Sequence, residues 1–189
     1  MWTGSDSSSA DEWIELYNRS TAPVDLSGWT ITRGDGEDEE VMILISSTVI
    51  PPGAVFLIAN YDADDPRSRL AWEPDLVDAA VSLPNSRLRL RLYDGDPASG
   101  QLVDEADDGS GAPFAGSGGD SKSSMVRVST DMAGSLPEAW SSALESTGWD
   151  AGAGELGAPG TISAEIRPNT ENSTQIAASS WARLKTTPS

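Results

Sequence analysis

The sequence is built from short segments in which apolar and polar residues alternate. The clearest is SRLRLRLY at 86–93, where Leu88, Leu90 and Leu92 alternate with arginines. Such alternation predicts a half-buried strand, because successive side chains of a strand point to opposite faces. The 12 prolines and 18 glycines of the chain interrupt nearly every stretch long enough for a helix. We therefore expect an all-β fold.

The remaining segments fit the same prediction. Two continuous apolar runs, at 40–46 and 54–59, suit strands buried on both faces, and residues 136–146 are a candidate for a short helix or turn. The other expected strands lie at 12–18, 28–33, 101–104 and 123–129. About eight short strands separated by turns predict a β-sandwich or barrel. From 161 onward the chain is polar and rich in Ser and Thr, so we expect a domain at 1–160 and a tail or linker at 161–189.

The composition excludes several kinds of function. The chain has no Cys and no His, which excludes Cys/His zinc sites and catalysis by a Ser-His-Asp or Cys-His arrangement. Its net charge is −18, which argues against a nucleic-acid partner, since contacts with phosphates need a basic face. No apolar run reaches the length of a transmembrane helix. Nothing singles out a catalytic pair among the 30 acids, so we predict no enzyme activity, no catalytic residue and no cofactor.

Acidic loops suggest one metal hypothesis. Asp62, Asp64, Asp94 and Asp96 lie in Asp-rich loops of the kind that supply oxygen ligands to Ca²⁺. Neither loop fits the EF-hand pattern: Pro66 interrupts the first, and the glycine of the second falls one place late. The alternative is an acidic surface in contact with solvent.

Two further features have a structural and a functional interpretation. Arg87, Arg89 and Arg91 could contact an anion, or they could pair with acids on neighbouring strands. The seven tryptophans likewise have either a structural role in the core or a functional role at an interface. We assign Trp13, Trp29 and Trp149 to the framework, and treat Trp2, Trp72, Trp140 and Trp181 as candidates for interfaces.

The order of the segments resembles the lamin tail domain. The matching pieces, over most of 11–161, are DEWIELYN (11–18), VDLSGW (24–29), IPPGAVFLIAN (50–60), SRLRLRLYDGD (86–96), GQLVDEA (100–106), SMVRV (124–128), and Trp149 followed by GAPGT (157–161).

The resemblance implies an immunoglobulin-like β-sandwich in a secreted or cell-surface protein. Members of the family usually have an apolar strand before the EWIELYN segment, whereas here only Met1 and Trp2 precede a polar stretch. We expect either that the chain has been trimmed here or that the sheet lacks part of its first strand. A sheet that lacks part of its first strand would expose unpaired backbone groups, to which another chain could add a strand.

Three functions remain open from the sequence. The first is a non-catalytic extracellular module for structure, adhesion or assembly, joined to copies of itself or to other surface proteins by strand or tail exchange. The second is an accessory targeting domain of a larger secreted nuclease or hydrolase, and the third is a Ca²⁺-dependent binder of carbohydrate or cell wall. For the first, the expected interface residues are Met1, Trp2, Ile162, Ile166, Ile176, Trp181 and Leu184.

Overall fold

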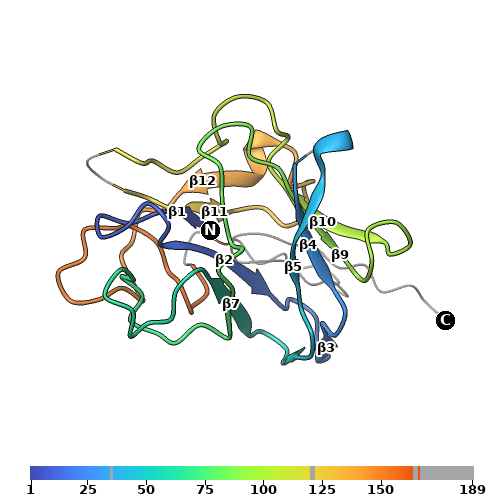
Figure 1. Cartoon of the computed structure of the whole chain (residues 1–189), viewed down its shortest axis with the longest axis horizontal. Helices are drawn as coiled ribbons and strands as arrows, with labels where there is room; N and C mark the ends of the chain where they lie inside the picture. Colours follow the sequence, from blue (N-terminus) through green and yellow to red (C-terminus); the bar gives the residue numbers. More distant parts are fainter. Residues whose placement is uncertain (35, 120–121, 164–165, 167–189) are drawn as a thin grey trace.

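Two four-stranded sheets pack face to face in this chain, as expected for a β-sandwich (Figure 1). The computed structural model describes residues 1–34, 36–119, 122–163 and 166. In chain order the strands are β1 (Trp2–Thr3), β2 (Glu12–Tyr17), β3 (Val24–Asp25), β4 (Thr30–Arg33), β5 (Glu40–Leu44), β6 (Val49–Ile50), β7 (Val55–Ala59), β8 (Leu76–Val77), β9 (Leu90–Tyr93), β10 (Leu102–Ala106), β11 (Met125–Arg127) and β12 (Trp140–Ser142). The first sheet has the order β1-β2-β7-β8 and the second the order β10-β9-β4-β5.

The fold class is confirmed. Eight of the strands in the described residues have three residues or more, and the helical elements there are two single 3-10 turns, η1 (Gly36–Asp38) and η2 (Pro137–Ala139). Small two-stranded sheets join β3 to β6 and β11 to β12. The division of the chain at residue 160 stays a prediction, because most of 161–189 lies outside the described residues.

The main core lies between the two sheets and follows from the alternating pattern. Ile14 and Leu16 of β2 contribute to it from one side, and Leu90 and Leu92 of β9 from the other. Each of these side chains is fully buried. The inward positions assigned from the sequence are therefore confirmed.

A second, smaller core covers the outer face of the first sheet. It is formed by Trp13 of β2, Leu57 and Ala59 of β7, and Leu70, with Trp149 packed against them. The Trp13 and Trp149 rings meet edge to face, with their centroids 6.0 Å apart. This second core explains why the apolar run at 54–59 is buried on both faces.

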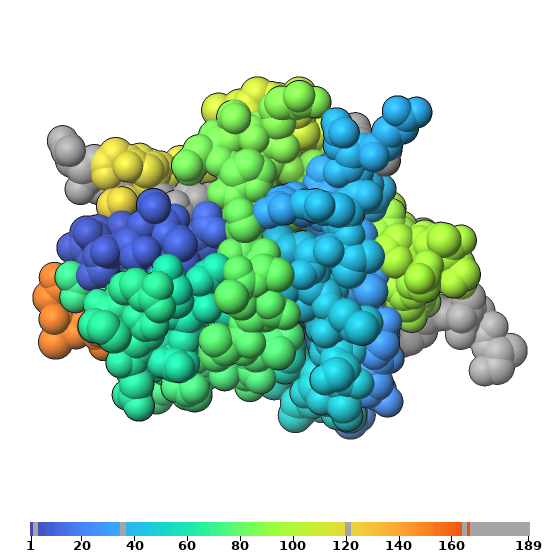
Figure 2. Space-filling model, viewed as in Figure 1, coloured from blue at the N-terminus to red at the C-terminus, as the bar shows by residue number. Residues whose placement is uncertain are grey.

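The edge of the sheet at β1 is closed by the chain itself. Trp2 and Thr3 pair with Trp13 and Glu12 of β2, and Met1 exchanges two backbone hydrogen bonds with Met125, of 3.2 and 3.1 Å. Figure 2 shows the first residues (dark blue) at the surface with later segments on either side, and Lys122 Nζ donates a hydrogen bond to the carbonyl of Ser5. The open edge that a missing first strand would leave is closed at Met1, which pairs with Met125 of β11.

Two other expectations also need correction. The run at 40–46 is not buried on both faces, because β5 is the last strand of its sheet and leaves Val41 and Leu44 exposed. Residues 136–146 contain only the η2 turn, and β12 follows it at once, since Trp140 adopts an extended conformation.

Candidate functional site

The first pair of candidate calcium ligands lies in the loop after β7. Asp62 and Asp64 are both exposed there. Asp62 accepts a backbone hydrogen bond from Asp65 N–H at 3.3 Å, and the Asp65 carboxylate forms an ion pair with Arg67 at 2.7 Å. The loop is thus organised by its own turn and by one ion pair.

The second pair lies in the hairpin between β9 and β10. Asp94 Oδ1 accepts a hydrogen bond from Gln101 N–H, and Asp96 Oδ1 accepts one from Ala98 N–H at 2.8 Å. Figure 1 shows this hairpin and the loop after β7 on opposite sides of the molecule. The structure does not bring the four aspartates together, and no group of three acids in the described residues is arranged to hold a metal ion. The calcium hypothesis stays a prediction.

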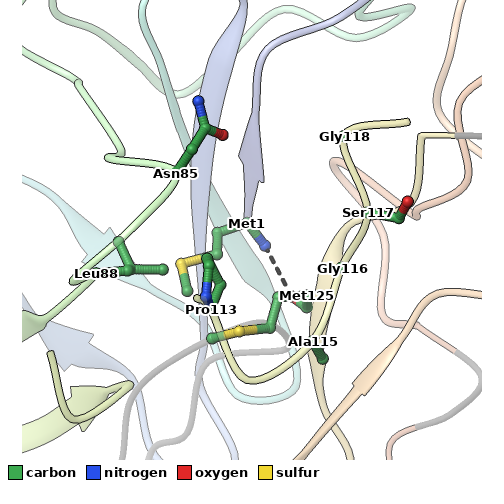
Figure 3. Close-up of a pocket in the computed structure, with 9 residues that line it drawn as sticks. All are labelled: Met1, Asn85, Leu88, Pro113, Ala115, Gly116, Ser117, Gly118 and Met125. Atoms are coloured by element: carbon green, nitrogen blue, oxygen red, sulfur yellow. Dashed lines mark hydrogen bonds between the residues drawn. The ribbon is translucent and has the colours of Figure 1, made fainter. Parts of the chain in front are cut away.

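The expected interface residues at the start of the chain lie next to a cavity. Met1 is buried and lines a half-open cavity of about 350 Å³, together with Leu88 and Met125 (Figure 3). Trp2 contributes its backbone to β1. Sequence reasoning missed this cavity, because Met1, Leu88 and Met125 are far apart along the chain.

The expected interface residues at the other end are described only in part. Ile162 is exposed, and Ile166 is half-buried with its N–H donating to Ser163 at 3.2 Å. Ile176, Trp181 and Leu184 lie outside the described residues. Their place at an interface stays a prediction.

Arg89, just before β9, and Arg91, within β9, belong to an ion-pair network on the outer face of the second sheet. Arg89 pairs with Glu105 of β10 at 3.2 Å, and Arg91 pairs with Glu39 at 2.5 Å. Glu39 also accepts a hydrogen bond from Tyr93, and these partners hold its pKa below the ordinary value although burial opposes them. The structural interpretation fits Arg89 and Arg91, whereas Arg87 is exposed and has φ 55°, which removes it from the strand.

The tryptophans divide nearly as expected. Trp13 and Trp29 are buried, and Trp149 is partly buried against Trp13. Trp72 is exposed, as an interface candidate should be. Trp140 was assigned wrongly: it is buried, its indole N–H donates to Gly134 O at 2.7 Å, and the guanidinium of Arg127 lies 5.0 Å from its ring centre.

Two glutamates of β2 have strongly shifted pKa values. Burial raises the pKa of Glu15 to about 8, although the N–H of Gly160 donates to its carboxylate at 2.7 Å. Burial also raises the pKa of Glu12 to about 7, opposed by the N–H of Leu83 and by Arg33. Three residues apart on one strand, the two side chains leave opposite faces of the sheet. They therefore cannot act together on one substrate as a pair of catalytic carboxylates.

A buried ion pair joins β10 and β11. Arg127 is fully buried, and its guanidinium contacts the carboxylate of Asp104 at 3.1 Å and the carbonyls of Ser129 and Met132, each at 2.7 Å. Burial raises the pKa of Asp104 to about 6, and Arg127 limits that increase. With its donors committed to the protein itself, Arg127 has a structural role.

Comparison with known proteins identifies the family. The family model called Lamin Tail Domain matches residues 2–110, which is more than half of the chain. Comparison with curated proteins and with solved structures gives no match. No helix among the described residues has the length and apolar character needed to cross a bilayer. The lamin tail domain is an immunoglobulin-like fold and, in general, a non-catalytic module. This chain belongs to the lamin tail domain family.

Proposed function

We propose that the chain is a non-catalytic extracellular or cell-surface module that assembles with further copies of itself. In this proposal burial of apolar surface stabilises the association, and the edge strand β5 forms one of the contacts between copies. The strongly acidic composition and the secreted or cell-surface setting that the resemblance to the lamin tail domain implies support the proposed location. The observation that carries the assembly proposal is the exposed apolar surface of β5.

The edge at β5 differs from the other long edge of the same sheet. Within the described residues β5 pairs only with β4, and Val41 and Leu44 are 52% and 60% exposed. At the opposite edge, the N–H of Asp107, just after β10, donates to the carbonyl of Gly134, so a loop of the chain approaches β10. Exposed apolar residues on an edge strand favour association with another strand or sheet.

A second copy of β5 suits this edge. If two copies run antiparallel about Met42, Glu40 of each lies opposite Leu44 of the other. The acidic residue at the start of the strand then does not face its own copy, so the pairing avoids like charges directly opposite each other. The N–H of Ser82 donates to the sulfur of Met42, so the chain near Ser82 already lies against Met42. We therefore expect the apolar contact between copies to be made by Val41 and Leu44.

The test is the mass of the protein in solution. Wild-type protein, Val41→Lys and Leu44→Lys are compared by light scattering over a wide concentration range, and each variant is expected to weaken association at least about tenfold, because it buries an unpaired charge. Leu102→Lys is the control, since Leu102 is also exposed but lies on β10. A wild-type protein that stays monomeric at the highest concentration contradicts the proposed function.

A further inference from the structure

The cavity beside Met1 has two chemically different sides. The side chains of Met1, Leu88 and Met125 gather on one side in Figure 3, while Asn85 and Ser117 lie apart from them. Met1 and Leu88 are each 1% exposed, so they belong to the main core as well as to the wall of the cavity. The asparagine is exposed and makes no hydrogen bond within the described part of the chain.

This lining suits one aromatic side chain. A volume of about 350 Å³ is at the lower end of the range for ligand pockets, roughly 300–1,000 Å³. Two methionine thioethers provide an adaptable surface that contacts aromatic rings favourably. A tryptophan fits both sides, because its indole is largely apolar and carries one N–H donor for the free amide of Asn85.

The chain carries such a residue in a segment of opposite charge. Trp181 is the sole aromatic residue after Trp149, and it lies in 172–189, which contains Arg183 and Lys185 and no acid. This segment therefore carries +2, and the rest of the chain carries −20. The loop 107–118 lines the cavity with residues 113 and 115–118 and contains no basic residue; of its two acids, Asp108 is half-buried and Asp107 is buried. The charges favour contact between the segment and this surface.

The length of the segment is sufficient. Trp181 lies fifteen positions after Ile166, the last described residue, and an extended chain of that length spans about 50 Å. Trp181 can therefore extend beyond the surface of its own copy.

We infer that Trp181 of one copy occupies the cavity beside Met1 of a neighbouring copy, with Arg183 and Lys185 against the acidic loop. The assignment to a neighbouring copy rests on the proposed assembly. The cavity and the charge of the segment are independent of β5, so the two contacts are tested separately.

The test uses the four methionines as reporters in the full chain. Protein labelled with ¹³C at the methionine methyl groups is compared by NMR with Trp181→Ala, at a concentration where the wild type is associated. The signals of Met1 and Met125 are expected to shift, because the ring that shields them is lost, whereas Met132 stays unchanged since it lies neither in the cavity wall nor in β5. Trp181→Phe, which keeps a ring, is expected to retain part of the shift, and Ser180→Ala is the matched control.

Dilution identifies the copy that donates the tryptophan. When the wild type is diluted until light scattering shows monomers, its Met1 and Met125 signals should move to the positions seen in Trp181→Ala. If they keep their positions, the segment occupies its own cavity and the assignment to a neighbour is wrong. Met1 and Met125 signals that are the same in the wild type and in Trp181→Ala overturn the inference altogether, even if the protein still associates through β5.

A variant of the cavity provides a second measurement. Asn85→Trp places a large ring on the rim without touching the core, and it should weaken association by the same factor as Trp181→Ala. The double variant should associate no more weakly than either single variant, because both substitutions remove the same contact. If the two substitutions weaken association by factors that multiply in the double variant, Trp181 does not bind in the cavity beside Asn85.

Discussion

At the scale of single residues, the outstanding feature is a carboxyl group buried beside the second core. Glu15 lies on the face of β2 that carries Trp13, and it is buried beneath the chain around Gly160. The charged groups that face it are the Met1 amine, whose pKa burial lowers to about 4, and Asp75. A group in this position is held neutral because burial penalises its charged form.

Glu15 should make the stability of the fold depend on pH. Its pKa rises from 4.5 to about 8 on folding, so between these values the folded state holds a proton that the unfolded state has released. This contribution lowers the free energy of unfolding as pH rises through the interval. Glu15→Gln removes it, and the variant should become more stable than the wild type with increasing pH, by on the order of 4 kcal/mol above pH 8.

Urea unfolding of both proteins from pH 4 to 9 provides the measurement. The comparison is made between variant and wild type, so that the contributions of groups that do not interact with Glu15 are common to both. Glu37→Gln, at an exposed position, controls for the loss of one negative charge. A stability difference between Glu15→Gln and the wild type that does not change with pH would show that Glu15 is ionised in the folded protein.

At the scale of elements, the segment 143–163 acts as a strap over the outer face of the first sheet. This segment follows the residues matched by the family model. It places the Trp149 ring against Trp13 and the N–H of Gly160 against the carboxylate of Glu15. The strap also holds itself together, since the N–H of Gly157 donates to Glu145 O at 2.6 Å and the indole of Trp149 donates to Gly157 O. It therefore converts an outer face that would be exposed into a second core.

Trp149→Ala should loosen this strap. Because the ring is partly buried against Trp13, its loss should cost about 2–3 kcal/mol of unfolding free energy. The amides of Gly157 and Gly160 should exchange with solvent faster, as measured by hydrogen exchange. Leu144→Ala changes an exposed side chain of the same strap and should stay within about 0.5 kcal/mol of the wild type. Equal losses in the two variants contradict the importance of the Trp149 contact.

At the scale of the whole molecule, one buried ion pair joins the family-matched sandwich to the chain that follows it. Asp104 is in β10, inside the match, and Arg127 is in β11, outside it. Because Met125 at the start of β11 also closes the edge beside Met1, the hairpin β11-β12 ties both sheets together. We expect residues 1–163 to unfold as one cooperative unit.

Asp104→Ala tests this connection. Removing one partner leaves the guanidinium of Arg127 buried without its counter-ion, which should cost about 3–5 kcal/mol. Glu105→Ala, which removes a more exposed ion pair with Arg89 on the same strand, should cost at most about 1 kcal/mol. Both are measured by denaturant unfolding followed by tryptophan fluorescence and circular dichroism. If the fluorescence and circular dichroism transitions no longer coincide in Asp104→Ala, the ion pair couples the family-matched sandwich to the chain that follows it.

The sequence by itself determined the elements whose pattern is local. Leu88, Leu90 and Leu92 alternate with arginines, and the period of two assigns them to the core because a strand turns alternate side chains to opposite faces. The same rule placed Ile14 and Leu16 inside and Trp13 and Glu15 outside. The order of such segments was enough to predict the family and the immunoglobulin-like sandwich.

The tertiary structure alone decided what covers each face and edge. A continuous apolar run was compatible with burial on both sides at 40–46 and at 54–59, yet only β7 is covered twice, because the strap lies over its sheet while β5 ends the other. Met1 meets Met125 across 124 positions of the chain, and no local pattern records that contact. Periodicity describes how a side chain leaves its own strand, whereas burial, shifted pKa values and cavities depend on segments that the fold brings there from elsewhere.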